Sequence, residues 1–409
     1  MRVKAFPALV PAPGLAESLA SVPYDVINTE EARALAEGRP NSFLRVERAE
    51  LELPAGVDPY SEEVYAHAKA NFEKMQNDGI FVREPEPCIY LYRQIMKGRT
   101  QMGITLACHI EDYENDIIKK HEKTRKVKED DRTRLTDVLS ANTGPVFLTY
   151  KDVASIDAFI DTWVASHEPT SDFIDDVEVQ HTVWRVTGAD AAPILSALGE
   201  VPFSYVADGH HRSASAARVG KERRDANPTH DGTEDYNWFL AVMFPASQLN
   251  IMPYNRVVKD LNGLSADSFL QRLAAKFRLD SNGQKVPEGA ESVCIYLEGK
   301  WHTLEWKAVI SENPIDRLDV SFLQDQILTP ILAIGDPRTD NRIDFIGGIR
   351  GTAELEKRVD SGDWAVAFSM FPTSMEELLA VADSGKIMPP KSTWFEPKLR
   401  SGLVVHLLK

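Results

Sequence analysis

The sequence is poor in cysteine and has no long apolar run. Its three cysteines, Cys88, Cys108 and Cys294, are scattered over 409 residues without a Cys-x-x-Cys pair. This spacing argues against a disulfide framework or a thiolate zinc site and is typical of a reducing compartment. The opening MRVKAFPALVPAPG lacks the apolar core of a signal peptide, and no run approaches the about eighteen apolar residues of a membrane span. We therefore expect a cytoplasmic protein without membrane contact.

The common nucleotide-binding and hydrolase signatures are also missing. There is no G-x-x-x-x-G-K-[S/T], no G-x-S-x-G and no H-E-x-x-H, and FIGGIRG does not match the dinucleotide loop G-x-G-x-x-G. Any nucleotide site must therefore be of another kind. Positive charge is scarce as well, because the chain has 46 Lys and Arg residues but 62 Asp and Glu residues, which gives a net charge of −16. This balance disfavours nucleic-acid binding and requires a local basic patch for any polyanion.

What is present is the composition of a globular protein, 43% hydrophobic and 26% charged. A chain of this length exceeds one comfortable core, so two or three domains are expected. Helix-like and strand-like patterns alternate without a regular βαβ rhythm, which predicts the α+β class. We divide the chain into an N-terminal mixed region (1–110), a core (111–254) and a C-terminal α+β domain (255–409).

Several elements follow from local patterns. SEEVYAHAKANFEKMQNDG, residues 61–79, has helical apolar spacing. Residues 87–96 and 101–110 read as paired strands around the turn KGRT, and WFLAVMFPA reads as a buried strand. In VPFSYVADGHHRSASAARVG, residues 201–220, a strand is followed by a turn and a short helix capped by Gly220. The polar KERRDANPTHDGTEDYN after Gly220 then predicts a loop.

The turn at Asp208-Gly209 has the features of an anion site. A strand, a glycine turn and a helix N-terminus aim free amides and the positive end of the helix dipole at one point. Arg212 adds a planar fork for phosphate oxygens, and His210 and His211 can donate hydrogen bonds or gain charge beside a phosphate. Two alternatives stay open: Asp208 caps the helix beside ordinary surface histidines, or the histidines bind a metal. Adjacent histidines in an extended chain point in opposite directions, which weakens the metal reading.

A second candidate is the basic segment IIKKHEKTRKVKEDDRTRL, residues 117–135. It holds eight cations against four acids within an acidic chain, which suits a polyphosphate. Glu122 lies among these cations, an environment that keeps a carboxylate ionised as a general base or metal ligand must be. The alternative is a solvated helix face with ion pairs four residues apart.

A third candidate is MPPKSTWFEPKLRSG, residues 388–402. Lys391, Ser392, Thr393 and Trp394 are consecutive hydrogen-bond donors, and the prolines around them limit the loop's freedom. Such a loop can hold a carboxylate or a phosphate. It can equally be a rigid C-terminal connection.

These motifs resemble known families. VADGHHRSASA is similar to the Gly-x-x-Arg phosphate motif of the ParB/sulfiredoxin-like fold, matched by Gly209 and Arg212. Sulfiredoxins carry a reactive cysteine where this chain has His210, so sulfinic-acid reduction is not expected. Free serine kinases carry a His-Glu pair, an Asp-Gly-His-His-Arg motif and a Pro-Lys-(Ser/Thr)-Thr loop in the order found here. Over nearly its full length, from VPYDVI to KSTWFEPKLRSGLV, the chain resembles the domain of unknown function 1015 (DUF1015) family.

The resemblance implies a ParB/sulfiredoxin-like nucleotide-binding core at 111–254 and a kinase that phosphorylates free L-serine, or a related hydroxyl compound, with Mg²⁺ and ATP or ADP. The partners would be a nucleotide and a small amino acid, with no nucleic acid and no membrane. The implied catalytic residues are His121, Glu122 as general base, and Asp208, which would also hold the metal. Phosphate would be bound by Lys123, Gly209, His210, His211 and Arg212, and the substrate by Lys391, Ser392 and Thr393.

Other functions fit the same residues. A non-catalytic nucleotide-binding regulator would use the same cradle, as ParB-like relatives illustrate. A metal-dependent hydrolase would be built on His121, Glu122, His210 and His211. Within the kinase reading, Asp25 in VPYDV is the alternative base to Glu122.

Overall fold

The computed structural model describes residues 1–408, and their contacts form two compact units. Unit 1 contains residues 1–120 and 124–249 together with the chain from Pro397 onward. Unit 2 contains His121–Lys123 and Asn250–Glu396. Both units combine helices with strands, so the expected α+β class is confirmed. The division into 1–110, 111–254 and 255–409 stays a prediction.

Unit 1 is built on a nine-stranded mixed sheet. Neighbours β6 and β11 are parallel, as are β8 and β12, and the other paired strands are antiparallel. The strands follow the order β6 (Ile118–Lys119), β11 (Ser204–Asp208), β8 (Val146–Tyr150), β12 (Trp238–Pro245), β5 (Arg99–His109), β4 (Cys88–Met96), β10 (Gln180–Thr187) and β9 (Ser171–Ile174), with β1 (Val3–Lys4) also on β5.

Two strand predictions are confirmed in this sheet. Strands β4 and β5 form a hairpin whose turn residues, Lys97 and Gly98, have φ of 51° and 77°. Positive φ at both positions is the type I′ geometry that suits a two-residue hairpin. The apolar run WFLAVMFPA forms β12, which is buried between β8 and β5.

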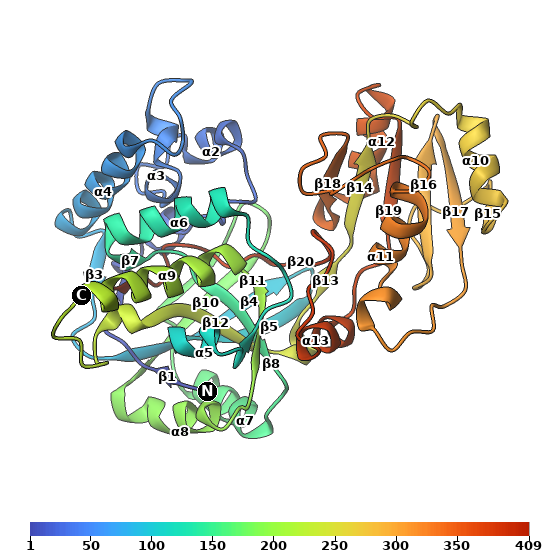
Figure 1. The fold of residues 1–409 in the computed structure, drawn as a ribbon. Helices are drawn as coiled ribbons and strands as arrows, with labels where there is room; N and C mark the ends of the chain where they lie inside the picture. The colour runs from blue at the N-terminus through green and yellow to red at the C-terminus, as the bar shows by residue number, and fades with distance from the viewer. Residues whose placement is uncertain (409) are drawn as a thin grey trace. The chain divides into compact units, whose positions relative to one another are not determined.

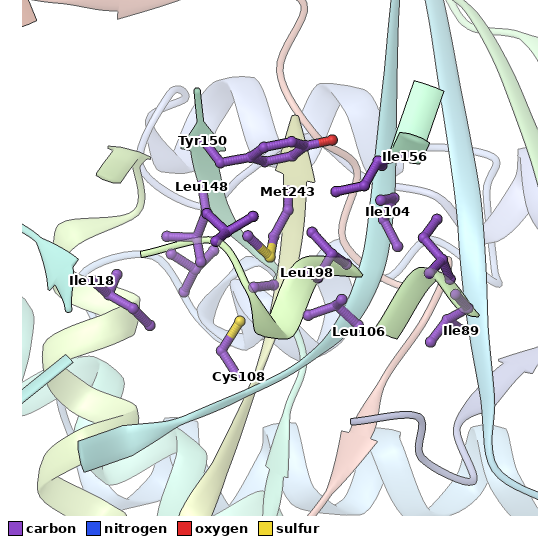
Figure 2. Packing of buried hydrophobic residues seen from close by; sticks show 14 of the residues in the cluster. Ile89, Ile104, Leu106, Cys108, Ile118, Leu148, Tyr150, Ile156, Leu198 and Met243 are labelled. Carbon is purple, nitrogen blue, oxygen red and sulfur yellow. The ribbon is translucent and has the colours of Figure 1, made fainter. Parts of the chain in front are cut away.

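The hydrophobic cluster on this sheet, one of several in unit 1, includes residues of two helices. Ile104 and Leu106 of β5 and Met243 of β12 pack with residues of α7 (Ala154–Ser166) and α8 (Gly188–Gly199). Figure 2 shows these side chains gathered with Ile156 and Leu198. Alternation along each strand sends every second residue into this layer, which fixes the register of the sheet.

Unit 1 contains further helices besides α7 and α8. The helix predicted over 61–79 is confirmed as α4. Among residues 1–408, no helix combines the length and apolar character needed to cross a membrane. The helices are α1 (Ala16–Leu19), α2 (Thr29–Ala36), α3 (Leu44–Glu47), α4 (Glu62–Asn77), α5 (Ile110–Glu114), α6 (Lys126–Leu139) and α9 (His210–Ala226) (Figure 1). Short pairs β2 (Leu9–Pro11) with β3 (Phe81–Arg83) and β7 (Ala141–Asn142) with β21 (His406–Leu407) complete the unit.

The predicted end of the helix at Gly220 is wrong. Helix α9 continues through Gly220 to Ala226, so the first six residues of the expected loop are helical. Gly220 is needed for packing instead, because a Cβ there would lie 2.4 Å from the backbone oxygen of Tyr236 and 2.5 Å from Cδ1 of Ile110.

Unit 2 contains a six-stranded antiparallel sheet with helix α12 (Gly351–Asp360) packed against it. Its strands follow the order β15 (Arg278–Asp280), β17 (Lys300–Glu305), β16 (Ser292–Leu297), β19 (Val366–Met370), β14 (Tyr254–Val258) and β18 (Ile343–Gly347). A separate pair joins β13 (Ile251–Met252) to β20 (Trp394–Phe395). The other helices are α10 (Ala266–Ala274), α11 (Asp319–Leu323) and α13 (Met375–Asp383).

Candidate functional site

The turn predicted at Asp208-Gly209 is present in unit 1. Strand β11 ends at Asp208, Gly209 has φ 95° and ψ 30°, and α9 begins at His210. This left-handed conformation is one that glycine adopts without steric cost. The Gly209 amide donates to Asp208 Oδ1 at 2.7 Å, which ties the carboxylate to the turn.

The Arg212 side chain folds back over this turn. A Cβ on Gly209 would lie 3.3 Å from Arg212 Nε, and one on Gly144 would lie 3.4 Å from Arg212 Nη1. Arg212 Nη1 donates to the Pro145 carbonyl, while the buried Nε has no hydrogen-bond partner. Two glycines therefore leave the space that the guanidinium fills. Arg212 also lines a cavity of about 20 Å³ with Arg132, enough for one water but not for a nucleotide.

Asp208 is ion-paired to a lysine that the sequence motifs did not single out. Lys398 Nζ lies 2.8 Å from Asp208 Oδ2, and the two side chains are 12% and 27% exposed. Burial alone would raise the pKa of the Asp208 carboxyl, but the charges of Lys398 and Arg212 outweigh it and hold that pKa below its usual range. The carboxylate is therefore ionised throughout the neutral range.

The two histidines differ in their surroundings. Burial lowers the pKa of His210 to about 4, although the Asp208 carboxylate acts in the opposite direction. His210 is therefore neutral at pH 7 in the free protein and offers hydrogen bonding rather than charge. His211 is less buried, and its Nε2 accepts a hydrogen bond from the Arg125 amide at 3.0 Å.

That hydrogen bond brings the N-termini of two helices together. Helices α6 and α9 run in parallel, with contacts from Ser215 Oγ to the Glu129 carbonyl at 3.1 Å and from Arg223 to Asp137 at 3.0 Å. Figure 1 shows the two helices side by side. Parallel helices place their positive dipole ends at the same edge, where an anion is favoured.

The basic segment 117–135 is less cationic in the fold than its composition suggests. Arg132 is buried and pairs with Glu47 and Asp131, both at 2.9 Å. At least three further cations pair with carboxylates, namely Lys120 with Asp116, Lys126 with Asp130, and Arg134 with Glu62. The alternative, a solvated helix face with ion pairs four residues apart, therefore describes only part of this segment. Some of the carboxylates that pair with its cations lie outside it.

Unit 2 brings two of the sequence-predicted motifs together. His121 Nε2 lies 3.5 Å from Thr393 Oγ1, although 272 residues separate them, and the His121 carbonyl accepts from the Met388 amide at 2.8 Å. His121 is buried, Glu122 is partly exposed and Lys123 is exposed. The His-Glu pair and the Lys391–Thr393 loop therefore belong to one local structure.

The Lys391–Thr393 loop is held by unusual backbone geometry and by a buried arginine. Lys391 has φ 60°, a conformation that costs a non-glycine residue about 1 kcal/mol or more. Its carbonyl accepts from Arg256 Nη2 at 3.0 Å, and Lys391 Nζ lies 5.4 Å from the centre of the Tyr254 ring. Burial lowers the pKa of Arg256 to about 10, which leaves it charged at neutral pH. Ser392 is buried, with its hydroxyl donating to the Pro389 carbonyl at 2.6 Å.

Lys398 and Arg256 are the residues that sequence reasoning missed. Lys398 lies inside the quoted stretch MPPKSTWFEPKLRSG, so the motif pointed to its neighbourhood without selecting it. No sequence signal marks Arg256, since it lies in an ordinary strand of unit 2.

A family model described as "Protein of unknown function (DUF1015)" matches residues 3–321. The chain belongs to the DUF1015 family. No curated protein matches this DUF1015 chain. Among solved structures, a free serine kinase in complex with AMP is 12% identical, with a TM-score of 0.36 over 71% of this chain and 86% of that one.

Two further solved structures are similar at the same level. SbnI with a C-terminal truncation, from Staphylococcus aureus, is 11% identical with a TM-score of 0.39 over 73% of this chain and 85% of that one. A conserved hypothetical protein from Pyrococcus furiosus is 12% identical with a TM-score of 0.35 over 71% and 90%.

Proposed function

We propose that this protein is a small-molecule kinase that transfers a phosphoryl group from ATP or ADP to free L-serine or a related hydroxyl compound, giving O-phosphoserine. The observation that carries the proposal is the turn at Asp208–Arg212. There, a left-handed glycine, a folded-back arginine and two neighbouring helix N-termini lie together, an arrangement that favours an anion. Phosphoryl transfer needs mainly positioning and charge neutralisation, which this arrangement supplies.

The phosphates of the nucleotide are assigned to this turn. Gly209 lets the phosphate chain approach the backbone, and Arg212 offers a planar fork to its oxygens. His210 and His211 donate hydrogen bonds to the phosphate oxygens. Within unit 1 we further propose that β11, the turn and α9 belong to a ParB/sulfiredoxin-like nucleotide-binding core.

Mg²⁺ is the metal expected with such a donor, and Asp208 fits it. Mg²⁺ is commonly held by one or two carboxylates together with substrate phosphates. Asp208 is an ionised carboxylate beside the phosphate turn, which is the ligand type required. When bound, the ion would neutralise charge on the phosphate chain. Asp208 would hold it there.

The acceptor is assigned to residues of unit 2. Lys391, Ser392 and Thr393 bind the amino-acid carboxylate, and Glu122 takes the proton of the serine hydroxyl. The hydroxyl oxygen forms a bond to the terminal phosphorus while the bond from that phosphorus to the nucleotide oxygen breaks. The products are O-phosphoserine and the nucleotide shortened by one phosphate. His121 positions the neighbouring Glu122, since its own side chain contacts Thr393.

An assay of the full-length protein with Mg²⁺, ATP or ADP, and L-serine tests the proposal, with Glu122→Gln as the decisive variant. Glu122→Gln should abolish O-phosphoserine formation while leaving nucleotide affinity nearly unchanged. Turnover that survives in Glu122→Gln would move the base to Asp25. Nucleotide binding without any phosphorylated product, across a panel of amino acids and nucleotides, would contradict the kinase and identify a nucleotide-binding regulator. Stoichiometric zinc or manganese in the purified protein would favour the hydrolase instead.

A further inference from the structure

Residues 397–402, which belong to unit 1, place a lysine at the Asp208 turn. Lys398 Nζ lies 2.8 Å from Asp208 Oδ2, and 190 residues separate the two in sequence. Taking an ammonium and a carboxylate out of water costs several kcal/mol unless the geometry compensates. Such a pair at a glycine turn therefore calls for an explanation beyond surface charge.

The segment is anchored on both sides of Lys398. The Lys398 carbonyl accepts from Gln94 Nε2 at 2.9 Å, and the fully buried Gln94 in turn accepts from Gln101 Nε2 at 2.9 Å. Further on, Ser401 exchanges backbone hydrogen bonds with Ser21 at 2.9 and 3.1 Å. The backbone that carries Lys398 is thus fixed independently of its ion pair.

Arg400 provides a further anchor. It pairs with Asp175, whose second partner is the Nε2 of His181 at 2.8 Å. His181 Nδ1 lies 2.7 Å from the Tyr92 hydroxyl, which extends the network into the sheet. All four side chains are buried or nearly so. A segment held this firmly delivers the Lys398 ammonium to one place, which is the preorganisation that charge stabilisation requires.

Positive charge gathers at this turn from two kinds of group. Lys398 pairs with Asp208, and the Arg212 guanidinium folds back over Gly209. The N-termini of α6 and α9 meet at the same turn and add the positive ends of their dipoles. Cations and helix N-termini together favour an anion at this place.

We propose that Lys398 is a phosphate ligand of this turn, its ammonium shared between Asp208 and an oxygen of the bound phosphate chain. This inference rests on the proposed function, because it assigns the anion to a nucleotide. In this proposal Lys398 contacts the phosphate chain of the nucleotide and neither its base nor its sugar. Pyrophosphate alone should therefore show the same dependence on Lys398 as ADP does.

Calorimetric titration of the full-length protein with ADP and with inorganic pyrophosphate, with Mg²⁺ present, tests this assignment. Lys398→Met should weaken both ligands at least about tenfold, as expected for loss of a charge-assisted hydrogen bond. Lys398→Arg, which keeps the charge, should recover most of the affinity. The matched control is Lys4→Met, because Lys4 forms a comparable 2.8 Å pair with Asp235 in the same unit. That variant should bind both ligands within about twofold of wild type.

The outcomes separate this inference from the kinase. Equal ligand affinities in Lys398→Met and Lys4→Met would overturn the role of Lys398 even if serine is phosphorylated. If affinity depends on Lys398 but no O-phosphoserine forms, only the kinase fails. If the wild-type protein binds neither ligand, both proposals fall. Should Lys398→Met not fold, Asp208→Asn combined with Lys398→Met removes the unpaired charge, and its affinity is compared with that of Asp208→Asn alone.

Discussion

At the scale of single residues, the Asp208–Arg212 turn combines a special backbone conformation with a cluster of charged side chains. Gly209 supplies a left-handed backbone, and the absence of its side chain leaves room for the Arg212 guanidinium. Asp208 stays ionised because Lys398 and Arg212 oppose the effect of burial. Each of these features is required if the turn holds a phosphate, and each can be altered separately.

Arg212→Ala should weaken nucleotide binding by at least about tenfold, because it removes the planar donor fork from the turn. Arg212→Lys should restore the charge but not the paired hydrogen bonds, so its nucleotide affinity should lie between those of wild type and Arg212→Ala. Calorimetric titration with ADP measures the effect. Arg39→Ala is the control, since Arg39 forms an exposed ion pair with Asp176 in the same unit. Unchanged affinity in Arg212→Ala would remove this turn from nucleotide binding altogether.

The turn could be predicted from the sequence, but the lysine that pairs with Asp208 could not. An Asp-Gly pair between a strand pattern and a helix pattern is a local signal, and its conformation depends on residues a few positions apart. The Lys398 pair depends on a contact across 190 residues, which no local pattern contains. The approach of His121 to Thr393 was expected only because the order of the motifs resembles that of a known family. Arg256 carried no signal, because a buried arginine that donates to carbonyls resembles any other strand residue.

At the scale of elements, helix α9 shows where local reasoning about glycine failed. Gly220 follows a short helical pattern, and a glycine in that place usually ends a helix. The residues after it, KERRDA, are mostly good helix formers and continue the helix to Ala226. The glycine is there because Tyr236 and Ile110 pack against its backbone. Tertiary contact, which the local pattern does not record, decides between a cap and a packing position.

Gly220→Ala should therefore destabilise the protein, although alanine is favoured over glycine by about 1 kcal/mol inside a helix. The added methyl group would lie 2.4 Å from the Tyr236 carbonyl oxygen, so α9 or the chain at Tyr236 must shift. We expect a net loss of about 1–3 kcal/mol in the free energy of unfolding, measured by urea denaturation.

Gly199→Ala is the matched control for this change. Gly199 is the last residue of α8, and a Cβ there would lie 4.0 Å from its nearest neighbour, the carbonyl oxygen of Met1. That variant should be neutral or slightly stabilising. A stabilising Gly220→Ala would mean that the packing at Tyr236 relaxes freely, contrary to the account of α9 given above.

At the scale of the whole molecule, carboxyl groups with shifted pKa values make stability depend on pH, and they act in both directions. In unit 1, the pKa of Asp235 is lowered to about 2, because its contacts with His406 and Lys4 outweigh burial, and the pKa of Asp208 is also lowered. Carboxylates of this kind stabilise the fold above their unfolded pKa of about 4, and that stability is lost as the pH falls below it. In unit 2, burial raises the pKa of Asp319 to about 7, assisted by Glu377 and opposed by the Glu291 amide.

Asp319 consequently makes the protein less stable as the pH rises. Between pH 4 and 7 the folded chain binds a proton at Asp319 that the unfolded chain has released, so the contribution of Asp319 to the free energy of unfolding decreases with pH across this range and levels off above it. The difference between a pKa of 3.8 and one of about 7 corresponds to at most about 4 kcal/mol. Histidines whose pKa burial lowers act in the opposite direction over part of this range, so the effect of Asp319 is measured as a difference between variant and wild type.

Asp319→Asn should remove this pH dependence while keeping the hydrogen bond that Asp319 Oδ1 accepts from the Glu291 amide at 3.1 Å. The variant should match wild type near pH 4 and become progressively more stable than wild type up to about pH 7. Thermal unfolding of the full-length protein at several pH values from 4 to 8 measures this difference. Asp325→Asn, an exposed position in the same unit, gives the matched change of charge and serves as the control. A constant offset for Asp319→Asn would mean that its carboxyl titrates normally in the fold and that burial in unit 2 does not set its pKa.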